Sequence, residues 1–209
     1  MNAQTERLEL AGAAGRIQAL RDRPDGVPRG VAVIAHPHPL FGGTMDNKVV
    51  QTLARAFVQC GWTAVRFNFR GVGASEGSFD EGRGEAADFQ QVVQAVAPEG
   101  ALALAGFSFG AFVAAQAVEA LWNARDVQSI VLVGTAASRF GVPPLPPDRH
   151  DRALVIHGEQ DDTVLLSAVL DWARPQSLPV TVVPGVEHFF HGQLPLLKGL
   201  VVRHLRTQG

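Results

Sequence analysis

The chain has 209 residues, a length that fits one domain with a substantial buried core. Hydrophobic residues make up 46% of the chain and charged residues 18%, which excludes a disordered chain. The formal net charge of −2, without a dense Lys/Arg run, argues against a nucleic-acid partner and against docking to an anionic membrane. With a single cysteine and no signal-peptide profile at its start, we expect a cytoplasmic protein.

The pattern of elements predicts an α/β domain with a mostly parallel sheet. Residues 7–10 and 16–20 flank a turn-like "AGAAG" and predict an antiparallel edge hairpin. Beyond them, short apolar runs alternate with segments of helical spacing. The predicted strands are 31–35, 63–67, 101–105, 129–133, 153–157 and 180–183, and the predicted helices are 46–59, 81–96, 109–121, 164–172 and 193–206. No repeat or linker divides residues 1–209, so we expect one domain, with the proline-rich 141–149 as a stiff surface loop.

The segment 101–122 is apolar enough to raise the question of a membrane span. Its only formal charge is Glu119, and its length would cross a bilayer. However, Gly106 and Gly110 interrupt it, and charged flanks are missing on both sides. We therefore interpret it as a buried strand that turns sharply into a buried helix, and we expect no membrane partner.

Ser108 stands at the predicted corner between that strand and that helix. It is the centre of "GFSFG", which matches G-x-S-x-G in its expected strand–turn–helix context. Such a corner needs glycines so that strand and helix can pack closely, and the helix N-terminus favours developing negative charge. The pattern predicts a nucleophile; the alternative is a serine that only caps the helix.

Two later strand ends supply the partners that a serine nucleophile needs. Asp161 follows the predicted strand 153–157, with Asp162 and Glu159 as neighbouring acids. His188 follows the predicted strand 180–183, and His191 competes with it. We favour Asp161 as the acid, with Asp162 as a cap for the next helix. We favour His188 as the base because it lies nearer to its strand end.

These residues carry a resemblance to the α/β-hydrolase superfamily. G-x-S-x-G, H-G-x-x-D and G-x-x-H, together with "AHPHPLFGGTMDNK" and "FNFRGVGASEGSFDEGRGEAAD", resemble a group of small bacterial serine hydrolases related to dienelactone-hydrolase-like and esterase members. The resemblance implies an α/β-hydrolase fold with an eight-stranded, mostly parallel sheet, helices on both faces and a Ser–His–Asp triad. It implies no particular substrate.

The loop "HPHPLFGG" is expected to supply part of an oxyanion hole. In the superfamily one N–H comes from this loop and another from the residue after the nucleophile, here Phe109. Proline has no N–H, which excludes Pro37 and Pro39 and leaves His38 or Leu40. Position slightly favours His38.

Two other readings of the loops are weaker. His36 and His38 form H-x-H, but no further histidines at later strand ends suggest a metal site, so we expect no metal and interpret His36 as fixing the loop. "RGVGASEG" starts like a dinucleotide fingerprint but has Glu76 at the sixth position, so we expect no cofactor. Arg70 and Ser75 are expected to pin that loop.

The expected function is cleavage of a small carboxylic ester, thioester or lactone through an acyl-enzyme. A peptidase or amidase on the same triad, or a binding protein that has lost catalysis, are the alternatives. Only residues 134–152 separate the sixth predicted strand from the strand before Asp161, leaving little room for a lid. We therefore expect an open pocket and a small acyl substrate as the partner.

Overall fold

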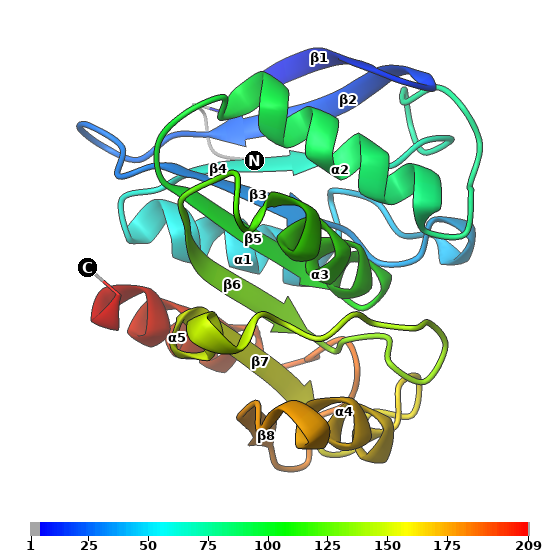
Figure 1. Cartoon of the computed structure of the whole chain (residues 1–209), viewed down its shortest axis with the longest axis vertical. Helices are drawn as coiled ribbons and strands as arrows, with labels where there is room; N and C mark the ends of the chain where they lie inside the picture. Colours follow the sequence, from blue (N-terminus) through cyan, green and yellow to red (C-terminus); the bar gives the residue numbers. More distant parts are fainter. Residues whose placement is uncertain (1–4, 209) are drawn as a thin grey trace.

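The computed structural model describes residues 5–208, which form one eight-stranded sheet with the order β1-β2-β4-β3-β5-β6-β7-β8 (Figure 1). The strands are β1 (Glu6–Gly12), β2 (Gly15–Asp22), β3 (Val31–Ala35), β4 (Thr63–Phe67), β5 (Leu102–Phe107), β6 (Val127–Val133), β7 (Ala153–Gly158) and β8 (Val180–Val183). β1 and β2 pair antiparallel, β2 is antiparallel to β4, and every pair from β4 to β8 is parallel. The carboxyl ends of the parallel strands therefore meet at one edge.

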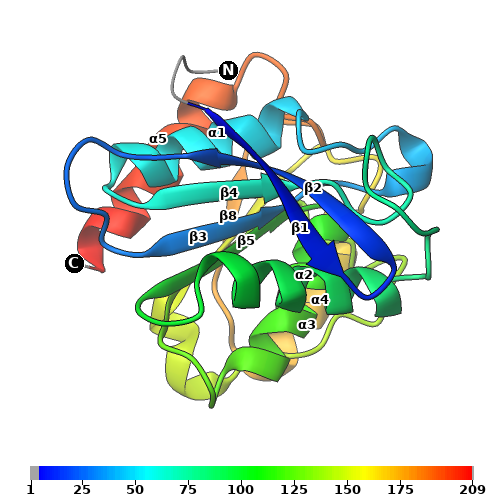
Figure 2. The same ribbon diagram turned by 90° about the horizontal axis from the view of Figure 1, so that it is seen from above.

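Helices cover both faces of this sheet, as the view from above shows (Figure 2). They are α1 (Lys48–Gln59), α2 (Arg83–Val96), α3 (Phe109–Leu121), α4 (Leu166–Ala173) and α5 (Leu194–Thr207). α1 and α5 pack on one face, where Phe57 and Leu197 belong to one apolar cluster. α2, α3 and α4 pack on the other, where Phe89 and Val169 belong to a second cluster. Burial on both faces explains why the central strands read as continuous apolar runs.

The predicted fold is confirmed, including the edge hairpin of β1 and β2. One difference matters for the site: β5 runs to Phe107 rather than to residue 105, so the strand reaches the residue before Ser108. α4 begins at Leu166 with Leu165 at its N-cap, so the prediction that Asp162 caps it is wrong. The proline-rich 141–149 is only partly a loop, since a 3-10 helix runs over Pro147–Arg152.

The loop after β4 is fixed by buried polar contacts. Ser75 Oγ donates to the Asn68 carbonyl at 2.7 Å and accepts from the Gln18 N–H at 2.9 Å. Arg70 forms a bidentate pair with the buried Asp88 at 2.9 and 2.8 Å. The expectation that Arg70 and Ser75 pin this loop is confirmed. No helix within residues 5–208 is long and apolar enough to cross a membrane.

Candidate active site

Ser108 lies at the corner between β5 and α3, at the carboxyl edge of the sheet. Its φ of 57° and ψ of −118° place a non-glycine residue in a strained region. Two backbone hydrogen bonds hold Ser108 in this conformation. Its N–H donates to the Val133 carbonyl at 2.8 Å, and its carbonyl accepts from the Ala111 N–H at 3.0 Å. Its side chain makes no capping hydrogen bond to the helix, so the alternative of a helix cap is wrong.

The two glycines beside Ser108 allow the backbone to approach itself closely. A Cβ on Gly106 would collide with the carbonyl of Gly110, on the first turn of α3. A Cβ on Gly110 would lie 2.5 Å from the carbonyl oxygens of both Ala35 and His36, at the end of β3. The motif therefore packs the serine corner directly against the start of the loop that follows β3.

A continuous chain of hydrogen bonds links Ser108, His188 and Asp161. Ser108 Oγ lies 3.0 Å from His188 Nε2, and His188 Nδ1 lies 2.6 Å from Asp161 Oδ2. All three residues are buried, with exposed fractions of 7%, 1% and 4% in that order. With the Nδ1 proton directed at the carboxylate, Nε2 is free to accept the serine proton.

The environment of Asp161 fixes its carboxylate. Oδ1 accepts from the N–H groups of Thr163 at 3.0 Å and Val164 at 2.7 Å, which leaves Oδ2 for His188. His157 supports the same turn, because its Nε2–H donates to the Val164 carbonyl at 2.8 Å and lies 3.4 Å from Asp161 Oδ2. Burial lowers the pKa of His157, so this imidazole stays neutral beside the carboxylate.

The competing acids and histidine have other contacts. Glu159 accepts from the Gly185 N–H at 2.8 Å, while Asp162 is exposed and meets only Thr163. His191 is exposed and pairs with Glu187 at 3.1 Å. Of the five residues that the sequence offered as acid or base, only Asp161 and His188 come together with Ser108.

His36 anchors the loop after β3. Its Nε2 accepts from the Phe69 N–H at 3.0 Å, so Nδ1 carries the proton and donates to the Pro37 carbonyl at 2.6 Å. The residue is fully buried, and this burial lowers its pKa to about 4. A neutral His36 thus ties the loop after β3 to the loop after β4, and the loop-fixing interpretation is confirmed.

The three residues expected at an oxyanion hole differ in their surroundings. Phe109 is the first residue of α3, where backbone N–H groups have no partner within the helix. His38 lines the same cavity as Ser108 and Phe109. Leu40 does not, and its N–H donates to His38 Nδ1 at 3.2 Å. Of the two open alternatives in this loop, only His38 lines the cavity that Ser108 lines.

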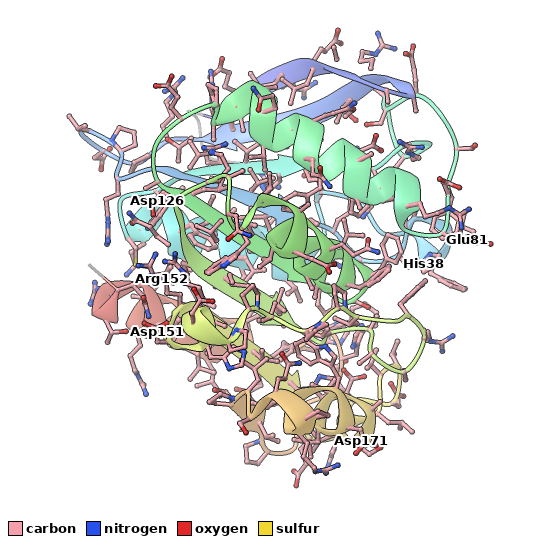
Figure 3. The ribbon with its side chains drawn as sticks, viewed as in Figure 1. His38, Glu81, Asp126, Asp151, Arg152 and Asp171 are labelled. Carbon is pink, nitrogen blue, oxygen red and sulfur yellow. The ribbon has the colours of Figure 1, made fainter. Side chains whose placement is uncertain are left out.

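A cavity of about 380 Å³ opens beside Ser108 and His188 at the carboxyl edge of the sheet. Its walls include four phenylalanines and two histidines, and they come from the loops after β3, β6, β7 and β8 and from the corner between β5 and α3. The side chains of the wall that carry the argument below are His38, Phe109, Arg139 and Phe140. Figure 3 shows His38 on the side of the molecule to which the strand arrows point, far from Asp126, Asp151 and Arg152.

Most of this wall is not predicted from the sequence. Phe140 and Phe189 follow β6 and β8, and Phe41 lies in the loop after β3 with 80% of its surface exposed. Large apolar residues in glycine-rich loops at the carboxyl ends of predicted strands were the available signal. Within residues 5–208, no group of three His, Cys, Asp or Glu side chains is placed to hold a metal ion.

Comparison with known proteins identifies the family. A protein-family model described as "Serine aminopeptidase, S33" matches residues 26–148. The chain belongs to this family of α/β serine hydrolases. The matched segment of this hydrolase includes Ser108 and His38 but ends before Asp161 and His188.

Related proteins agree with this assignment. The structure of XC6422 from Xanthomonas campestris, a serine hydrolase without a lid, has 38% identity and a TM-score of 0.86, covering 99% of this chain and 96% of its own. A serine hydrolase homologue from Coxiella burnetii has 37% identity and a TM-score of 0.81, covering 96% and 97%. The uncharacterized protein RP471 of Rickettsia prowazekii is 30% identical over 86% of this hydrolase and 79% of its own length.

Proposed function

We propose that this serine hydrolase cleaves a small carboxylic ester through an acyl-enzyme, with Ser108 as nucleophile, His188 as base and Asp161 as the acid that orients it. The observation that carries the proposal is the chain of hydrogen bonds from Ser108 Oγ to His188 Nε2 at 3.0 Å and from His188 Nδ1 to Asp161 at 2.6 Å. A hydroxyl is a weak nucleophile by itself, and this arrangement supplies the base that it needs.

Each step follows from these contacts. Ser108 Oγ attacks the ester carbonyl carbon while its proton passes to His188 Nε2, and the imidazolium is stabilised by the Asp161 carboxylate. The N–H groups of Phe109 and His38 would stabilise the oxyanion of the tetrahedral intermediate. Collapse of this intermediate breaks the C–O bond, and the alcohol leaves with the proton from His188. Water then attacks the acyl-enzyme by the same route, which releases the acid and restores Ser108.

An aminopeptidase, as the family description names, is the second candidate. Recognition of a free α-ammonium group calls for acidic side chains near the scissile bond. Within residues 5–208, the side chains that line the cavity include no aspartate or glutamate. This wall favours an ester over a peptide with a charged N-terminus.

Substitution of the nucleophile tests the proposal. We expect Ser108→Ala to lower kcat/KM on phenyl acetate by at least about 10⁴-fold, since loss of a triad nucleophile typically removes nearly all covalent catalysis. Ser167→Ala, at an exposed serine on α4, is the matched control and should keep full activity. A fluorophosphonate should label the unmodified protein and not Ser108→Ala. An unlabelled protein without esterase activity would favour the binding-protein alternative.

A further inference from the structure

The cavity beside Ser108 has one formal positive charge and no negative one among its lining side chains within residues 5–208. That charge is Arg139, which lies in the loop after β6, between Ala136 and Phe140. The other walls are mostly aromatic or small. A single cation in an apolar cavity of about 380 Å³ points to a small ligand with one anionic group.

The side chain of Arg139 contributes no polar contact to the fold within residues 5–208. Its side chain has no hydrogen bond or ion pair with any residue of the described chain, whereas Arg66, Arg70 and Arg152 each hold a backbone or carboxylate partner. Arg139 is exposed, so its guanidinium retains its donors for a ligand. A planar guanidinium with paired donors matches a carboxylate in particular.

The charge of Arg139 acts on His38, which lines the same cavity. Burial, and then the nearby Arg139, lower the pKa of His38. His38 therefore stays neutral, accepts the Leu40 N–H on Nδ1 and adds no second cation to the wall. The His38 ring lies 4.9 Å from that of Phe109 and 6.0 Å from that of Phe140, so this neutral side chain packs among the aromatic rings of the wall.

We propose that the substrate is a short ester that carries a free carboxylate, bound by Arg139, on an apolar frame lying against Phe140. This inference rests on the proposed function and adds the class of substrate to it. Phe140 follows Arg139 in the chain and lines the cavity with it, and the fully buried Phe109 supports its ring edge to face at 5.2 Å. A carboxylate on the alcohol side and one on the acyl side are both within this class.

Esters that are matched except at the carboxylate test the proposal. With the charge on the alcohol side, 4-acetoxybenzoate is compared with methyl 4-acetoxybenzoate. With the charge on the acyl side, monophenyl adipate is compared with phenyl hexanoate. The measured quantity is the ratio of kcat/KM for the carboxylate ester to that for its neutral partner, in the unmodified protein and in two variants.

Arg139→Gln is the test variant, and Arg203→Gln is its control. Arg203 is also exposed and without a side-chain partner in the described chain, but it lies in the second half of α5. That end of α5 is close to the C-terminus, opposite the strand arrows (Figure 1). Both variants lower the net charge equally, so a general effect of charge on association would appear in both.

We expect Arg139→Gln to lower the ratio at least about fivefold for one of the two pairs, mainly through KM, and Arg203→Gln to leave it unchanged. The preference should also weaken as salt is added. An unchanged ratio in Arg139→Gln, or an equal fall in both variants, overturns the inference.

Labelling of Ser108 separates this inference from the proposed function. Benzoate should protect Ser108 from a fluorophosphonate better than benzamide does, and the difference should disappear in Arg139→Gln. Equal protection by benzoate and benzamide in the unmodified protein overturns the carboxylate site, while the nucleophile stands as long as Ser108 is labelled. If Ser108 is not labelled and no ester is cleaved, both proposals fail.

Discussion

The neutral state of His36 makes a specific prediction about stability and pH. Folding buries this imidazole completely and lowers its pKa from the ordinary 6.5 to about 4. The folded state therefore binds the proton more weakly than the unfolded state. The resulting stabilisation is fully present above pH 6.5 and is lost as the pH falls toward 4.

The expected size follows from the two pKa values. Between pH 7.5 and pH 5 the unfolded His36 becomes protonated while the folded one remains neutral, which removes about 2 kcal/mol from the free energy of unfolding. His36→Gln removes this titration. It also disturbs the bonds to Phe69 and Pro37, so we expect the variant to be about 1–3 kcal/mol less stable at pH 7.5.

Urea unfolding of both proteins at several pH values measures the effect. The buried His157 and the half-buried His204 also have lowered pKa values, so the difference between the unmodified protein and the variant is the informative quantity. This difference should shrink by about 2 kcal/mol between pH 7.5 and pH 5. His191→Gln, at an exposed histidine, should follow the unmodified protein. A difference that stays constant with pH refutes the assignment of His36 as a buried neutral residue.

Two further substitutions test the geometry of the site. Gly134→Ala would place a Cβ 3.1 Å from His188 Cε1, at a residue whose φ is 55°. We expect the free energy of unfolding in urea to fall by about 1–2 kcal/mol, and kcat to fall about 10–100-fold because the imidazole is displaced. Full activity would contradict the tight contact. Glycine tolerates the positive φ of residue 108, which strains the alanine of Ser108→Ala. We therefore expect Ser108→Gly to have a free energy of unfolding up to about 1 kcal/mol higher than Ser108→Ala, with both variants inactive. A less stable glycine variant would argue against strain at Ser108.

The fold could be predicted from the sequence because its elements are locally encoded. Buried parallel strands are continuous apolar runs, and their order along the chain leaves few ways to build a sheet. The ends of elements were less certain. β5 continues through Gly106 and Phe107 because it pairs with Leu132 and Val133 of β6, a tertiary contact that outweighs the weak strand propensity of glycine.

The site was predictable to the extent that it depends on the ends of strands. Asp161 and His188 follow β7 and β8, so the sheet itself brings them to the edge where Ser108 lies. Position along the chain favoured His38 only slightly over Leu40, because the engagement of the Leu40 N–H depends on the His38 side chain turning back to accept it. The role proposed for Arg139 could not be predicted from the sequence either, because only the three-dimensional structure shows that its side chain lacks a partner within residues 5–208.

Gly110 allows the start of α3 to pack against the end of β3. A Cβ there would lie 2.5 Å from the carbonyl oxygens of Ala35 and His36, so any side chain would separate α3 from the end of β3. That separation would move Ser108 and Phe109, at the start of α3, away from the loop that carries His38. The His36 imidazole holds the same loop from the other side through the Phe69 N–H. The last glycine of the serine motif therefore sets the distance between Ser108 and the loop after β3, while His36 fixes the position of that loop.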